Sequence, residues 1–317
     1  MIQADTGPTA DSANAKLAVG IIGVGAMGGA MARCLLRNGY RVIVRDIIAE
    51  RVDALLKLGA VPVASAAAVA QHATIMLSVV VDSTQTDEVL FGADGFATAA
   101  GRNSTVVLCS TMAPDYVAGL PTRLAPRGIK VVDAPISGGP MRALAGTLSM
   151  MAAATPEAME RVVPVLEVLA TKLFRVGARA GDGSRMKIVN NMLAGINLAA
   201  GAEAMALAER MGMDLQLVHD VVCASSGGSW IFADRMPRAI AADYAPRAAA
   251  KILTKDVGLA IAAAEAAGVP VALARAAHRA YEGTVAQGLG EADDAALIEY
   301  FRALIRRTPQ TEPNREQ

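Results

Sequence analysis

The sequence is poor in aromatic residues and has no excess of charge of either sign. Phe, Trp and Tyr together make up 3% of the 317 residues, too few for a surface on which nucleic-acid bases could stack. The 30 Lys and Arg residues balance the 30 Asp and Glu residues, and no basic run stands out. A neutral chain without a basic patch argues against nucleic acid and against an anionic membrane surface as partners.

Cysteine and histidine are also scarce. The three cysteines, Cys34, Cys109 and Cys223, are far apart and form no Cys-x-x-Cys pair, and the three histidines are scattered. This spacing indicates neither a disulfide framework nor a zinc site, so we expect no metal.

Long hydrophobic runs are missing as well. No apolar run reaches the roughly 18 residues of a membrane span. Residues 1–15 contain no apolar segment of the kind that a signal peptide needs. We therefore expect a cytoplasmic protein without a membrane partner, with a disordered tail at 1–16 and a frayed tail at 308–317.

The remainder of the chain is rich in apolar residues. Hydrophobic residues make up 53% of the sequence, enough for two domains at about 150 residues each. Apolar strands alternate with helical patterns up to about residue 182, and only helical patterns follow. We predict an α/β fold in which a Rossmann-type doubly wound sheet (residues 17–182) precedes an all-helical domain for substrate binding and dimerisation (residues 183–307).

The strongest motif stands near the start of the first domain. Leu17–Val24 is an apolar, β-branched run, and the glycine-rich turn Gly23-Val-Gly-Ala-Met-Gly28 follows at once and opens a helix. A second strand, Arg41–Asp46, completes the strand, turn, helix and strand of a dinucleotide-binding unit. The pyrophosphate would lie at the helix N-terminus. We expect cofactor contacts from Gly23, Gly25, Ala26, Met27 and Gly28.

Asp46 bears on the choice of cofactor. A carboxylate at the end of the second strand can accept hydrogen bonds from the adenosine ribose hydroxyls, and it would repel a 2′-phosphate. Because Ile47 and not an arginine follows, we predict NAD rather than NADP. A helix cap or an ordinary surface charge is the alternative interpretation of Asp46.

More strands follow in the first domain, each bounded by turn residues or by a helical pattern. The apolar runs predict strands at Thr74–Val81, Ser104–Leu108 and Lys130–Asp133. Leu148–Ala153 and Lys172–Val176 are expected as the last, edge strands.

The ends of these strands point to further cofactor contacts. In an open parallel sheet the ligand binds at the carboxyl ends of the strands. Val80, Val81, Ser110 and Thr111 are therefore expected near the cofactor. Ser110 and Thr111 could equally cap the helix that follows them.

A second motif follows the strand that ends at Asp133. Ser137-Gly138-Gly139 stands between a strand and a helix, where consecutive backbone N–H groups are exposed. Such a turn can hold a carboxylate, although a plain loop is the simpler interpretation.

The third motif opens the longest helical pattern, Ser184–Met211. Lys187, Asn190 and Asn191 lie at i, i+3 and i+4 after Gly183, so they share one helix face. Oxidation of an alcohol requires a group that takes the hydroxyl proton, and a lysine that is partly removed from water can be neutral enough for this task. We interpret Lys187 as the acid/base of a nicotinamide-dependent hydroxyacid dehydrogenase. The alternative is a lysine that merely extends to solvent.

These motifs resemble those of the β-hydroxyacid dehydrogenases, the family of 3-hydroxyisobutyrate dehydrogenase and tartronate semialdehyde reductase. The resemblance extends from Leu17 to Phe301 and includes Lys255-Asp256 as a fourth motif in the same order. Within the family, the branch that acts on four-carbon sugar acids is the most similar, as in Ser229-Trp-Ile-Phe232 and Asp243-Tyr-Ala-Pro-Arg247.

The resemblance implies an active site in the cleft between the two domains, with Lys187 as the catalytic acid/base. It implies that Ser137, Gly138, Gly139 and Asn191 bind the carboxylate and hydroxyl of the substrate, and that Lys255 lies beside the nicotinamide and the substrate. The expected substrate is a small hydroxycarboxylate, above all a four-carbon sugar acid such as L-threonate. The expected assembly is a homodimer or homotetramer.

Other functions stay open at this point. One is activity of the 3-hydroxyisobutyrate dehydrogenase or tartronate semialdehyde reductase type. Another is a non-catalytic cofactor-binding protein, which would be expected to lack Lys187. An imine reductase would usually carry aspartate or tyrosine at that position.

Overall fold

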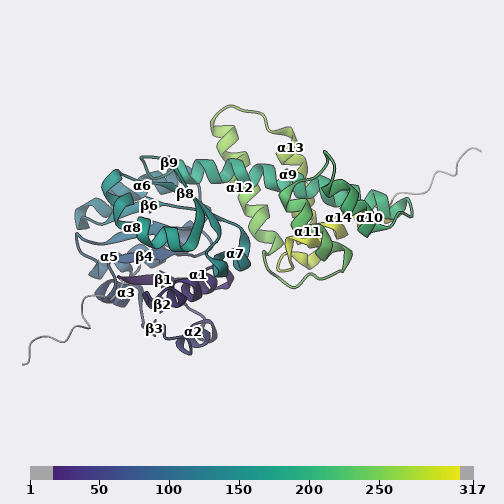
Figure 1. Ribbon diagram of the computed structural model, residues 1–317. Helices are drawn as coiled ribbons and strands as arrows, with labels where there is room; N and C mark the ends of the chain where they lie inside the picture. Colours follow the sequence, from purple (N-terminus) through teal and green to yellow (C-terminus); the bar gives the residue numbers. More distant parts are fainter. Residues whose placement is uncertain (1–16, 308–317) are drawn as a thin grey trace, which may run out of the picture. The chain divides into compact units, whose positions relative to one another are not determined.

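The computed structural model describes residues 17–307, which divide into two compact units at Lys187 and Ile188 (Figure 1). The tails expected at 1–16 and 308–317 lie outside the described residues. Each unit is treated below by itself.

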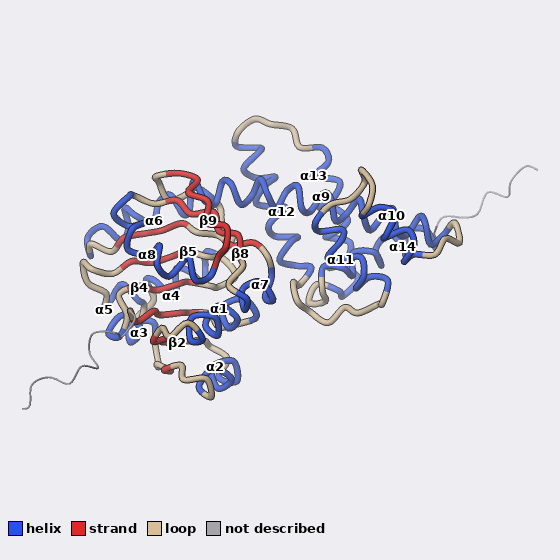
Figure 2. The backbone as a smooth tube through the Cα atoms, viewed as in Figure 1, coloured by secondary structure: helices blue, strands red, loops and turns tan. Residues whose placement is uncertain are grey.

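The first unit contains one sheet, which within the described residues has nine strands (Figure 2). Their bounds are β1 Ala18–Ile22, β2 Arg41–Arg45, β3 Val61–Pro62, β4 Ile75–Ser78, β5 Thr105–Leu108, β6 Lys130–Asp133, β7 Ile136–Ser137, β8 Leu148–Ala153 and β9 Ala170–Gly177. The helices of this unit are α1 Ala26–Arg37, α2 Ala49–Leu56, α3 Ala66–His72, α4 Ser83–Phe91, α5 Phe96–Ala99, α6 Pro114–Leu124, η1 Ala125–Arg127, α7 Gly139–Ala145 and α8 Pro156–Leu169. The long helix α9, Asp182–Arg210, begins in the first unit and continues into the second.

The strand order confirms the doubly wound sheet. The order is β3-β2-β1-β4-β5-β6-β8-β7, and the pairs from β3 to β6 are all parallel. The chain moves outward from β1 to β3 and then returns to the other side of β1 with β4. This reversal between β1 and β4 is the switch point at which such sheets bind their ligands.

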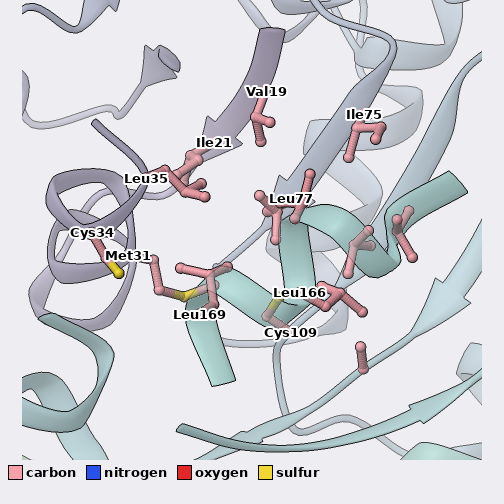
Figure 3. Close-up of a cluster of buried hydrophobic side chains, with 14 of the residues drawn as sticks. Val19, Ile21, Met31, Cys34, Leu35, Ile75, Leu77, Cys109, Leu166 and Leu169 are labelled. Carbon is pink, nitrogen blue, oxygen red and sulfur yellow. The ribbon is translucent and has the colours of Figure 1, made fainter. Parts of the chain in front are cut away.

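Alternation along the strands gives the sheet two apolar faces. Ile75 and Leu77 of β4 belong to the cluster on one face, whereas Met76 belongs to the cluster on the other. Helices α1 and α8 supply the first cluster, and α3, α5 and α6 supply the second. Figure 3 shows the first cluster, in which the labelled side chains are Val19, Ile21, Met31, Cys34, Leu35, Ile75, Leu77, Cys109, Leu166 and Leu169. Burial on both faces explains why these strands have nearly continuous apolar sequences.

The prediction that Leu148–Ala153 is an edge strand is wrong. Strand β8 pairs with β6 and β7 in antiparallel fashion and with β9 in parallel fashion, so it lies inside the sheet. Strand β7 could not be predicted, because a strand of two residues has no periodicity. The Ser137 predicted to lie in a loop therefore belongs to a short strand that pairs with Ser149.

The apolar run Thr74–Val81 is a strand only over Ile75–Ser78. The backbone groups of Val80 and Val81 bond to side chains instead. The Val80 carbonyl accepts a hydrogen bond from Ser110 Oγ at 2.6 Å, and the Val81 N–H donates to Gln85 Oε1 at 3.0 Å. The chain thus turns away from the sheet three residues earlier than its hydropathy suggests.

The second unit is helical over its described residues, as predicted. After α9 its elements are α10 Leu215–Cys223, α11 Trp230–Ile240, α12 Ala250–Ala266, α13 Ala272–Thr284, η2 Val285–Leu289, η3 Asp294–Ala296 and α14 Leu297–Arg307. Helix α11 was not predicted; it begins after Ser229, whose Oγ accepts a hydrogen bond from the Phe232 N–H. Over residues 17–307 no helix combines the length and the apolar character needed to cross a membrane.

Candidate active site

The glycine-rich turn lies at the carboxyl end of β1. Gly23 has φ +87°, which a side chain would strain, and Gly25 is the N-cap of α1. A Cβ atom on Gly28 would lie 1.9 Å from the Gly23 carbonyl oxygen, so only glycine allows α1 to pack so closely on the turn. A Cβ atom on Gly25 would meet only the guanidinium of Arg51, whose Nη1 would lie 3.7 Å away. This backbone fits the approach of a pyrophosphate.

Asp46 is buried just after β2 and is tied to this turn. Its Oδ2 accepts a hydrogen bond from the Val24 N–H at 2.7 Å, and its Oδ1 accepts one from the Ile48 N–H at 2.9 Å. Arg51 Nη1 lies 3.6 Å from Asp46 Oδ1. The carboxylate oxygens keep further lone pairs for ribose hydroxyls. Arg51 was not predicted as a neighbour of Asp46, because it lies on α2 and does not follow Asp46 directly.

The predicted residues after β4 and β5 come together at the same edge of the sheet. The bond from Ser110 to the Val80 carbonyl joins the two strand ends, and the Val79 N–H donates to the Ile22 carbonyl of β1. Val81 is 46% exposed, and Thr111 follows Ser110 directly. These residues therefore lie beside the switch point of the sheet, where the sequence placed them.

Asp133 connects two of the motifs in the first unit. This fully buried carboxylate accepts hydrogen bonds from the Gly181 N–H and the Ser184 N–H, both at 2.8 Å, and from Ser184 Oγ at 2.9 Å. A Cβ atom on Gly183 would lie 2.5 Å from the Met151 carbonyl oxygen, so glycine is needed for α9 to start against β8. Burial raises the pKa of the Asp133 carboxyl, and the bonds from Ser184 and Gly181 oppose that shift.

Lys187 follows Ser184 by one helical turn and is buried, with 6% of its surface exposed. The alternative of a lysine that extends freely to solvent does not agree with this burial. Asn191 lies one turn further along α9 and is also buried, whereas Asn190 is exposed. Asn190 Nδ2 donates to Asn191 Oδ1 at 3.0 Å.

In the second unit a carboxylate links two predicted substrate contacts. Asn191 Nδ2 donates to Asp256 Oδ2 at 2.6 Å, and Lys255 Nζ lies 2.8 Å from Asp256 Oδ1. Asp256 is 3% exposed. Its place beside Lys255 in the Lys-Asp motif was visible in the sequence, but its role as the partner of Asn191 was not. The structure therefore groups the predicted residues within each unit: the turns and strand ends in the first, and Asn191 with Lys255 in the second.

Two family models match consecutive parts of the chain. The model described as the NAD binding domain of 6-phosphogluconate dehydrogenase matches residues 18–177. The model described as NAD-binding of NADP-dependent 3-hydroxyisobutyrate dehydrogenase matches residues 181–301.

Individual relatives are similar over most of their length. An L-threonate dehydrogenase of Cupriavidus necator is 40% identical over 89% of this chain and 95% of its own. An L-threonate dehydrogenase of Escherichia coli is 38% identical over 90% of this chain and 95% of its own. The chain belongs to the NAD-dependent hydroxyacid dehydrogenases of the 3-hydroxyisobutyrate dehydrogenase family. The family assignment makes it an enzyme, with NAD as its cofactor and a small hydroxyacid as its substrate.

A solved structure of the same family is named for a different substrate. The 3-hydroxyisobutyrate dehydrogenase of Salmonella typhimurium superimposes with a TM-score of 0.85 at 36% identity, covering 89% of this chain and 99% of that one. Relatives of this dehydrogenase at comparable identity thus carry the names of two different substrates.

Proposed function

We propose that this dehydrogenase oxidises a four-carbon sugar acid, with L-threonate as the leading candidate, and that Lys187 is its catalytic acid/base. The observation that carries the proposal is the burial of Lys187 on α9, one turn after the anchored Ser184 and one turn before the buried Asn191. A lysine held away from water favours its neutral form, which is the form that can accept the hydroxyl proton.

Ser137, Gly138 and Gly139 are proposed to bind the substrate carboxylate, and Asn191 and Lys255 to bind its hydroxyl groups. Asp256 holds Asn191 and Lys255 in place, because its Oδ2 accepts a hydrogen bond from Asn191 Nδ2 at 2.6 Å and its Oδ1 lies 2.8 Å from Lys255 Nζ. The Gly23–Gly28 turn would hold NAD, which would supply the acceptor for the hydride that the substrate carbon loses. In the reverse direction protonated Lys187 donates to the carbonyl oxygen.

The preference for a polyhydroxylated substrate follows from the polar side chains among the proposed substrate contacts. The Ser137 hydroxyl and the Asn191 amide can form hydrogen bonds with the hydroxyl groups of a sugar acid, which a plain alkyl hydroxyacid lacks, and this difference disfavours the alkyl substrate. The names of the Cupriavidus and Escherichia relatives support the same choice.

A comparison of substrates tests the proposal. L-threonate, D-erythronate, 3-hydroxyisobutyrate, D-glycerate and 4-hydroxybutyrate are supplied at equal concentration with NAD, and the absorbance of the reduced nicotinamide is followed. We expect the highest kcat/KM for a four-carbon sugar acid. If 3-hydroxyisobutyrate or 4-hydroxybutyrate gives the highest value, the second candidate, the activity named for the Salmonella structure, replaces the first.

A further inference from the structure

Arg142, on the short helix α7, lies against the turn proposed to hold the substrate carboxylate. A Cβ atom on Gly138 would lie 3.0 Å from Arg142 Cδ, 3.1 Å from its Cβ and 3.3 Å from its Nε. Gly138 also has φ +133°, which an L side chain rarely adopts. Glycine at this position therefore serves two purposes: it forms the turn, and it lets the arginine side chain pack directly on it.

The arginine is fixed at both ends by Thr147. Arg142 Nε donates to the Thr147 carbonyl at 2.9 Å, and the Thr147 N–H donates to the Arg142 carbonyl at 2.8 Å. The side chain is partly buried in this arrangement. Since Nε is used by the backbone, the two Nη groups are the donors left for another partner.

No carboxylate of the protein neutralises this guanidinium within residues 17–307. Arg142 takes part in none of the ion pairs found there, and α7 itself, Gly-Pro-Met-Arg-Ala-Leu-Ala, carries no acidic residue. By contrast, two other arginines of the same unit form ion pairs. Arg185 Nη1 lies 2.7 Å from Asp182 Oδ1, and Arg123 Nη1 lies 2.8 Å from Asp87 Oδ1. The Arg142 guanidinium therefore provides a positive charge beside the Ser137–Gly139 turn, and its two Nη groups are available as hydrogen-bond donors.

We propose that Arg142 is a further substrate-binding residue, which pairs with the carboxylate of the hydroxyacid and determines the preference for an anionic substrate. This inference rests on the proposed function, because it takes the Ser137–Gly139 turn as the carboxylate site. A guanidinium matches a carboxylate in shape and charge, and such charge-assisted bonds are about twice as strong as those from neutral groups. The neutral N–H groups of the turn can position the carboxylate, and the arginine supplies the charge that selects it.

The test compares Arg142→Gln and Arg142→Lys with wild type and with a matched control, Arg102→Gln. Arg102 packs over another positive-φ glycine of the same unit, Gly128, with its Cγ 2.8 Å from the would-be Cβ. For the best hydroxyacid of the panel, we expect Arg142→Gln to raise KM about 10- to 100-fold, with kcat within threefold of wild type and the Kd for NAD unchanged. The KM of Arg142→Lys should lie between those of wild type and Arg142→Gln, because the lysine ammonium keeps the charge but cannot bind a carboxylate in a bidentate manner. Arg102→Gln should match wild type.

A second measurement separates this inference from the proposed function. Calorimetric titration of the NADH-loaded protein with L-threonate, and with its uncharged amide, reports binding without turnover. Wild type should prefer the acid, and Arg142→Gln should lose most of that preference. If wild type oxidises hydroxyacids but Arg142→Gln keeps its KM within twofold and its preference for the acid, the inference about Arg142 is refuted. If wild type turns over no hydroxyacid of the panel, the proposed function itself fails.

Discussion

The buried carboxylate of Asp133 anchors Ser184, 51 residues later, through both the backbone N–H and the side-chain hydroxyl of the serine. Asp133 is the last residue of β6, and Ser184 lies in the first turn of α9. The aspartate therefore acts as a remote cap for the helix that carries Lys187. Two sequence motifs that are far apart along the chain are one structural unit at this point.

This anchor should show in the stability of the protein. Asp133→Ala leaves two backbone N–H groups and a hydroxyl without their acceptor, and each such buried group costs about 1–3 kcal/mol. Ser184→Ala removes one bond and should cost about 1 kcal/mol. Urea unfolding of both variants and of the double variant gives the coupling energy, which we expect to exceed about 0.5 kcal/mol. Ser225→Ala, at an exposed serine, is the control. Strict additivity of the two single variants would contradict the anchor.

Lys187→Ala should separate chemistry from cofactor binding. Without the group that takes the hydroxyl proton, we expect kcat to fall at least about 100-fold. The Kd for NAD, measured by fluorescence titration, should stay within about twofold, because the glycine-rich turn is untouched. Lys172→Ala, at an exposed lysine of β9, should have wild-type kinetics. A Lys187→Ala enzyme that retains more than a third of the activity would exclude Lys187 as the acid/base.

Much of the first unit could be predicted from the sequence, because its signals are local. The apolar strand, the glycine-rich turn and the helix around Gly23–Gly28 follow each other directly, and β6 has the bounds that its pattern predicted. The switch point follows from the order of strands and helices. Helical spacing predicted one face of α9 for Lys187, Asn190 and Asn191, and of these Lys187 and Asn191 are buried whereas Asn190 is exposed.

The contacts between motifs could not be predicted, because no local pattern encodes them. Asp133 looked like the end of a strand, and its bonds to Gly181 and Ser184 depend on how β6 and α9 meet. The position of β8 inside the sheet depends on the two-residue strand β7. Arg142 looked like an ordinary helix residue until its packing on Gly138 was visible.

Asp46 should control the choice between NAD and NADP. We predict a higher kcat/KM with NAD, because this buried carboxylate would repel a 2′-phosphate. Asp46→Ala should narrow the difference in kcat/KM between NAD and NADP, mainly by lowering kcat/KM with NAD. The variant also removes the carboxylate whose Oδ1 lies 3.6 Å from Arg51 Nη1. Steady-state kinetics with both cofactors measures the ratio, and Asp53→Ala, an exposed aspartate on the same helix as Arg51, is the control. Equal kcat/KM values for the two cofactors in the wild type would refute the prediction.

The stability of the helical unit should depend on pH through Asp294. Burial raises the pKa of this carboxyl to about 6, and Arg235, whose Nε lies 2.5 Å from Asp294 Oδ1, offsets only part of the shift. At this carboxyl the folded protein therefore binds more protons than the unfolded chain between about pH 4 and pH 6. The contribution of Asp294 to the free energy of unfolding should decrease as the pH rises through this window.

A variant isolates this effect from the other carboxyls. For Asp293, burial acts in the same direction, but hydrogen bonds from the backbone of Arg247, Ala295 and Ala248 and the charge of Arg238 outweigh it and lower the pKa. Asp293 thus changes stability with the opposite sign. In Asp294→Asn only the contribution of Asp294 is absent. The free energy of unfolding of wild type minus that of the variant, from urea denaturation, should fall by about 2 kcal/mol between pH 4.5 and 7. Asp53→Asn should give a difference that does not change with pH. A difference for Asp294→Asn that stays constant, or that grows with pH, would show that Asp294 is charged over the whole range.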